Sequence, residues 1–142
     1  YEVLNEDMAK ACLSAIWLYH NYLQESHKIS QTIQARDGSY WHGIMHRRDL
    51  DFNNSKYWFR QVGEHPIFEP LRIFAKVITS KSEPDKSTEF FLKQSIWDPI
   101  AFINLCEACI KGRSPSEMLC RKIQQKEWQL LFDYCYWYAI KH

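Results

Sequence analysis

Apolar residues recur at helical spacing along most of the 142-residue chain, whereas the alternating pattern of a half-buried strand is nearly absent. Asn5, followed by Glu6 and Asp7, carries the signals of a helix start. Apolar residues then recur every three or four positions as far as Leu23. This first helix is predicted to continue to about Ile33. The pattern as a whole predicts an all-α fold.

Turn and capping signals predict five further helices. They are expected at residues 40–48 after the turn Asp37-Gly38-Ser39, 55–62 after Asn54, 65–78 from His65-Pro66, 99–110 after Asp98, and 115–138 after Ser114. Gly63 is placed to end the third predicted helix. The polar segment 80–88 is predicted to be a mobile loop rather than a domain boundary. Residues 1–142 are therefore predicted to form a single-domain bundle of six or seven helices.

Charge and hydropathy disfavour two classes of binding partner, nucleic acids and membranes. Eighteen Lys and Arg residues against seventeen Asp and Glu residues give a formal net charge of +1, so no global field attracts nucleic acid. No apolar stretch approaches the roughly 20 residues of a membrane span. Nucleic-acid binding and membrane insertion are both disfavoured.

The cysteines indicate a compartment. Their number, five, is odd, which fits reduced thiols better than a disulfide framework, and a cytoplasmic location is predicted. Cys106 and Cys109 form a C-x-x-C pair in the middle of a predicted helix, away from the N-terminus where a thiolate is stabilised. These cysteines are interpreted as buried thiols between helices.

Histidines form the most distinctive cluster. His42, His46 and Asp49 share one face of the second predicted helix, because residues four and seven positions apart lie close in angle. His27 would meet this face near His46 if the first two helices form an antiparallel hairpin about Asp37-Gly38. Such side chains could ligate a divalent metal such as Zn²⁺ or Fe²⁺, with positions open for water or substrate. The three histidines are equally the predicted acid and base groups of an enzymatic site.

A structural interpretation of the same histidines stands beside the functional one. His20 lies on the stripe of His27, so four histidines are expected along one seam. Histidines at helix interfaces are commonly half-buried and hydrogen-bonded to one another, to tyrosines or to the backbone. Gly43 also stands where the metalloprotease motif has its catalytic glutamate, so that diagnostic motif is absent.

Basic residues next to the histidines predict an anion site. The predicted ligand-binding set comprises Arg47, Arg48, Lys56, Tyr57, Arg60 and His65. The cationic members could hold the carboxylate or phosphate of a small molecule through charge-assisted hydrogen bonds. The alternative is an internal salt network with Asp49, Asp51 and Glu64.

Residues 23–66 resemble an uncharacterised family of bacterial and fungal proteins with a YWHxIMHRRExDxxNxKYWFRRVGxHP-like core. The chain departs from that pattern at Asp49, where the family has glutamate, and at Gln61, where it has arginine. The first change gives a shorter carboxylate side chain at a predicted metal ligand. The second replaces a cationic side chain of the predicted anion site with a neutral one. The resemblance implies no particular reaction or cofactor.

The sequence therefore predicts a helical protein with a His- and Arg-rich polar pocket for a small anionic ligand or a divalent metal, with enzymatic activity left open. The alternative is a non-catalytic interaction protein in which the same residues form a structural polar network. The substrate and the oligomeric state are also left open.

Overall fold

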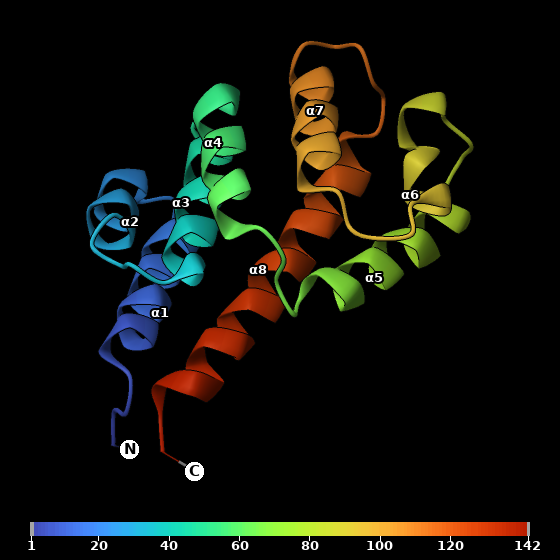
Figure 1. The fold of residues 1–142 in the computed structure, drawn as a ribbon. Coiled ribbons are helices and arrows are strands. Elements are labelled where there is room, and N and C mark those ends of the chain that lie inside the picture. The colour runs from blue at the N-terminus through green and yellow to red at the C-terminus, as the bar shows by residue number, and fades with distance from the viewer. Residues whose placement is uncertain (1, 142) are drawn as a thin grey trace. The chain divides into compact units, whose positions relative to one another are not determined.

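The structure, a computed structural model, describes residues 2–141 and is all helical (Figure 1). Its elements are α1 (Glu6–Tyr19), α2 (Leu23–Ser30), α3 (Arg36–Arg48), α4 (Phe52–Val62), α5 (Phe68–Ser80), the 3-10 helix η1 (Lys86–Thr88), α6 (Phe90–Lys93), α7 (Pro99–Ile110) and α8 (Glu117–Ala139). The predicted all-α class is confirmed. The predicted count of six or seven helices is too low, because residues 2–141 contain eight α-helices.

The first predicted helix is in fact two helices. Asn21 has a φ of 66°, a left-handed conformation that asparagine tolerates better than most residues, and it reverses the chain between α1 and α2. The amide of Tyr22 then donates to the carbonyl of Trp17 at 2.8 Å. The two helices are joined by a buried hydrogen bond between the hydroxyls of Ser14 and Ser26 at 2.9 Å.

Helix α3 starts earlier than predicted. The expected turn at residues 37–39 lies inside the helix, which begins at Arg36 after an N-cap at Ala35. Gly38 is required by packing rather than by a turn, because a Cβ there would lie 2.5 Å from the Cβ of Ile33. The reversal between α2 and α3 therefore lies at residues 31–35, before its predicted position at residues 37–39.

The turn between α3 and α4 also differs from the prediction. Leu50 has a φ of 61°, and the cap of α4 is Asp51, whose Oδ1 accepts from the amide of Asn54 at 3.3 Å. Asn54, the predicted cap, thus lies within the first turn of the helix. Gly63, with a φ of 65°, ends α4 at the predicted place.

Helices α3 and α4 approach each other closely along their length. A Cβ on Gly43 would lie 2.7 Å from the ring of Phe59, so only glycine fits this crossing. The hydroxyl of Ser55 donates to the carbonyl of Gly43 at 2.7 Å in the same buried contact. This close contact sets which α4 side chains face the histidines of α3.

Later helices start close to their predicted caps. The carboxylate of Asp98 accepts from the amide of Ala101 at 3.0 Å, as the sequence indicates. The hydroxyl of Ser114 accepts from the amide of Ser116 at 3.2 Å just before α8. The predicted loop at 80–88 contains the short helix η1 and is followed by α6.

The chain forms two compact units. The first comprises the chain up to Gly63 together with the residues from Leu131 onward, and the second comprises Glu64–Leu130. Trp41 and Tyr40 are fully buried in the first unit, and Phe91 and Phe102 are fully buried in the second. Within residues 2–141, no helix combines the length and the apolar character that crossing a membrane requires.

Candidate metal centre

Three histidines converge in the first unit. His27 comes from α2, and His42 and His46 come from successive turns of α3. The ring centroid of His27 lies 4.6 Å from that of His42 and 5.5 Å from that of His46, and the last two are 4.8 Å apart. Each imidazole offers one ligand atom within 4.8 Å of the others. The structure thus brings together the three histidines that the sequence predicted as metal ligands or acid and base groups.

His20 does not belong to this group. It forms the C-cap of α1, and its exposed ring lies edge-on against Tyr19 with the centroids 5.2 Å apart. The chain reverses at Asn21, between His20 and helix α2. His20 and His27 are seven residues apart in the sequence, but they therefore do not lie on the same face of one helix.

Burial leaves the imidazole nitrogens of α3 with few partners. His42 is only 4% exposed, and among residues 2–141 its buried Nδ1 atom has no hydrogen-bond partner. The buried Nδ1 atom of His46 likewise makes no hydrogen bond to any described residue. Buried polar atoms in proteins are nearly always hydrogen-bonded, so two such nitrogens side by side call for a ligand or another explanation.

Trp58 of α4 covers the cluster on one side. Its indole lies nearly parallel to the ring of His42, with centroids 4.0 Å apart and an interplanar angle of 16°. The indole is placed there by the close crossing of α3 and α4 at Gly43 and Phe59. Trp58 was not identified from the sequence, because its helical spacing alone indicates a core position as readily as a site position.

Both α3 histidines are held in their neutral form. Burial, together with smaller effects of the neighbouring His46 and His27, lowers the pKa of His42 to about 4. Burial also lowers the pKa of His46, although the carboxylates of Asp51 and Asp49 oppose this effect. Neutral imidazole is the form that binds metals, so these residues need not lose a proton at neutral pH to do so.

The spacing of the ligand atoms fits a metal after modest side-chain movement. Zn–N distances of about 2.0–2.1 Å in a tetrahedral site place two ligand nitrogens about 3.3 Å apart. The widest separation here is 4.8 Å, so the imidazoles would draw together by about 1.5 Å around an ion. Three neutral imidazoles suit Zn²⁺, Cu²⁺, Fe²⁺ and Ni²⁺.

Asp49, a predicted metal ligand, lies outside this group. Helix α3 ends at Arg48, and Asp49 is its exposed C-cap, which is not among the residues whose ligand atoms converge. The chain turns instead through Leu50, and Asp51 Oδ2 lies 3.9 Å from His46 Nδ1. The sequence gives no signal for this exchange, because it depends on a positive φ at a leucine.

Arg47 and Arg48 of the predicted anion site have separate surroundings. Arg47 is 3% exposed, and its guanidinium carbon lies 5.6 Å from the centre of the Phe59 ring. Arg48 donates to the side-chain oxygen of Asn21 at 3.2 Å. Burial and the charge of Arg47 both lower the pKa of Arg48. The two adjacent arginines therefore do not form a single clamp.

The remaining predicted anion-binding residues are Lys56, Tyr57 and Arg60 on α4, and His65 after it. Tyr57 and Arg60 are exposed on α4, and Lys56 is half-buried. His65 belongs to the second unit, where its Nδ1 atom accepts from the amide of Ile67 at 3.2 Å. His65 thus has a local role at the start of α5.

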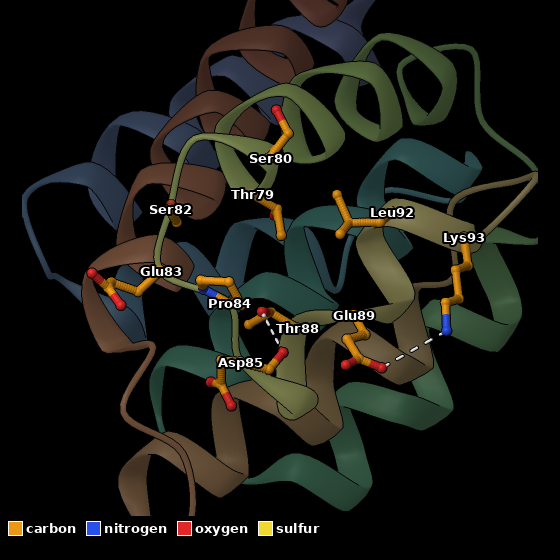
Figure 2. A pocket seen from close by; sticks show the side chains of 10 residues that line it. All are labelled: Thr79, Ser80, Ser82, Glu83, Pro84, Asp85, Thr88, Glu89, Leu92 and Lys93. Atoms are coloured by element: carbon orange, nitrogen blue, oxygen red, sulfur yellow. Dashed lines mark hydrogen bonds and ion pairs between the residues drawn. The ribbon is translucent and has the colours of Figure 1, made fainter.

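A cavity of about 330 Å³ lies in the second unit between the end of α5 and α6, and no part of it was predicted (Figure 2). Thr79 on its wall is 7% exposed, and among the described residues its hydroxyl has no hydrogen-bond partner. Glu89 and Lys93 form an ion pair of 3.8 Å at its edge (Figure 2). The segment that the sequence indicates only as a loop therefore builds part of a pocket.

Comparisons of the chain with protein-family models, with curated proteins and with solved structures found no match. Membership of the uncharacterised family that residues 23–66 resemble stays a prediction. The functional inference therefore rests on the geometry of the histidine cluster.

Proposed function

We propose that this protein binds a divalent transition-metal ion, Zn²⁺ in the first instance, through the imidazoles of His27, His42 and His46. The observation that carries this proposal is the convergence of three imidazoles from two helices, each offering a ligand atom within 4.8 Å of the others. Three histidine ligands are a recurrent protein contribution to a zinc centre that keeps a position open.

Two further features support a ligand at this place. The buried Nδ1 atom of His42 makes no hydrogen bond to residues 2–141, which is costly unless something else satisfies this atom. The same burial keeps both imidazoles neutral, so a metal does not compete with protons for them near neutral pH.

The proposed centre leaves a fourth coordination position. A water molecule or a small anion would occupy it, and a water bound to Zn²⁺ in this manner ionises near pH 7. The small anionic ligand expected from the sequence would then bind to the metal itself. The enzymatic chemistry that such a centre would supply is hydrolysis or hydration, because the bound metal would lower the pKa of a water held by these three histidines.

The competing proposal is a structural polar network without a metal. It is favoured by the parallel packing of His42 on Trp58 at 4.0 Å, which resembles the packing of an aromatic core residue. In this case the histidines stabilise the contact of α2, α3 and α4 and bind nothing.

Metal titration distinguishes the two proposals. Metal-free protein without a histidine tag is titrated with Zn²⁺ in a calorimeter, alongside the variants His42→Ala, His46→Ala and His20→Ala. We expect one Zn²⁺ per chain, at least a 100-fold loss of affinity in the first two variants, and no change in the third. His20→Ala is the matched control, because His20 is exposed and outside the cluster.

Thermal unfolding of the same variants supplies the second readout. If wild-type protein binds no divalent metal, or if His42→Ala lowers the melting temperature but leaves metal affinity equal to that of His20→Ala, the metal proposal fails and the structural network is favoured.

A further inference from the structure

We propose that Asp51 is the positioning residue of the metal centre: its carboxylate accepts a hydrogen bond from the Nδ1–H of His46 and thereby presents Nε2 of that imidazole to the metal. This inference rests on the proposed function and names a residue that does not itself ligate.

The geometry brings these two groups together. Asp51 Oδ2 lies 3.9 Å from His46 Nδ1, and the imidazole side chain is 13% exposed whereas the carboxylate is 45% exposed. The Nδ1 atom has no hydrogen-bond partner among residues 2–141. A direct hydrogen bond requires the two atoms to approach by about 1 Å, to the usual distance of 2.7–2.9 Å for a charged acceptor. The exposed carboxylate has the freedom to make this movement.

The backbone holds the carboxylate in reach of the imidazole. The amide of Asp51 donates to the carbonyl of His46 at 2.9 Å, so the two residues are joined directly across the turn that follows α3. Leu50, with its φ of 61°, closes this turn. Asn54 then orients the carboxylate from the other side, because its side-chain amide donates to Asp51 Oδ2 at 2.9 Å. Asp51 is thus kept next to His46 by its backbone and oriented by Asn54, and only an approach of about 1 Å remains to be made.

The chemistry of metal-bound histidine supplies the reason for such a partner. A ligating imidazole usually donates its second N–H to a carboxylate or carbonyl, which fixes the tautomer, orients the ring and raises the basicity of the ligating nitrogen. In His46, a proton held at Nδ1 by Asp51 leaves the lone pair on Nε2. Without the carboxylate, either tautomer can form, and only one of them presents Nε2 to an ion.

Asp49 offers a matched control. It is a carboxylate three residues from His46, it is exposed at the end of α3, and none of the described histidine nitrogens lies within ion-pair distance of it. Its charge still acts on His46 through space. Replacing it therefore removes one negative charge near the site without removing the proposed hydrogen bond.

The test compares Asp51→Asn with Asp49→Asn in full-length, metal-free protein titrated with Zn²⁺. Asparagine retains the shape of Asp51 and its ability to cap α4, since it is itself a favoured N-cap residue. We expect Zn²⁺ affinity to fall 10- to 100-fold in Asp51→Asn and less than about twofold in Asp49→Asn. Equal affinities in the two variants overturn the role of Asp51.

Nitrogen-15 chemical shifts of the His46 ring provide a readout that a purely structural role would not move. We expect a protonated Nδ1 and a metal-shifted Nε2 in the Zn²⁺-loaded wild type, and a loss of this single tautomer in metal-free Asp51→Asn. The two proposals fail in distinguishable ways. Absence of Zn²⁺ binding by the wild type removes the metal centre, whereas wild-type binding that needs His42 but is unchanged in Asp51→Asn removes only the role of Asp51.

Discussion

The ring of His42 lies parallel to the indole of Trp58, with centroids 4.0 Å apart. Residues 42 and 58 belong to different helices, and their contact exists because Gly43 lets α4 approach α3 closely. The indole is a main part of the apolar surface against which this imidazole is buried.

Removal of the indole should raise the pKa of His42. Burial is the largest cause of its low pKa of about 4, so Trp58→Ala, which opens this face to water, should move the pKa towards the ordinary value of about 6.5. NMR titration of the His42 ring protons measures this shift. Trp137→Ala is the control, because Trp137 is 58% exposed and should leave the value unchanged.

Stability should fall as the pH is lowered from about 6.5 to about 4. The unfolded chain protonates His42 near pH 6.5, whereas the folded protein protonates it only near pH 4, so the unfolded state binds more protons across this interval. The free energy of unfolding should therefore be greatest above pH 6.5, and we expect a loss on the order of 1–3 kcal/mol by pH 4. The lowered pKa of His46 adds an effect of the same sign.

Urea unfolding of metal-free protein at several pH values between 7.5 and 4 measures this dependence. The same series on His42→Gln separates the contribution of His42 from those of the other titrating groups. A slope that is as steep in His42→Gln as in wild type would contradict the assignment to His42.

The crossing of α3 and α4 should tolerate no side chain at position 43. In Gly43→Ala the new Cβ would lie 2.7 Å from the ring of Phe59, which is 1% exposed and cannot move into solvent. We expect a destabilisation of about 1–3 kcal/mol, measured by urea unfolding. In the double variant Gly43→Ala with Phe59→Leu, the smaller side chain relieves the clash, so the two effects should be less than additive. Strict additivity would show that the two positions do not touch.

Cys109 should be the first cysteine to react with a thiol reagent in the folded protein. It is half-buried, whereas the other four are buried. Burial raises the pKa of Cys12 to about 11 and that of Cys135 above its usual range, and the neighbouring Cys106 together with burial raises that of Cys120. A thiol with a raised pKa forms little of the reactive thiolate.

Absorbance with an aromatic disulfide reagent, followed by peptide mass mapping, measures the reaction. One thiol should react early, and all five should react once the chain is unfolded. An early phase that persists in Cys109→Ser would contradict this order.

Local features of the sequence predicted much of the helical structure. The caps at Asn5 and Asp98 and the helix end at Gly63 were predicted correctly, because each depends on one side chain and the backbone within a few residues of it. Gly38 was misinterpreted as part of a turn. A glycine required for a close contact with Ile33 looks the same in the sequence as one required for a left-handed turn.

Two residues with positive φ account for most of the differences in the histidine region. Asn21 divides the first predicted helix, and Leu50 turns the chain after Asp49 so that Asp51 comes back to His46. Leucine rarely adopts this conformation, so no local pattern indicates it. Asp51 therefore takes the place near His46 that helical spacing assigned to Asp49.

The sequence by itself determined that the chain is helical and that His42 and His46 occupy the same face of one helix, since both follow from the 3.6-residue period. Only the tertiary structure decided that His27 meets them, that Trp58 covers His42, and that Asp51 rather than Asp49 lies beside His46. These relationships depend on where the chain reverses and on how closely two helices pack. Both are set by contacts between residues distant in sequence, which a local period does not encode.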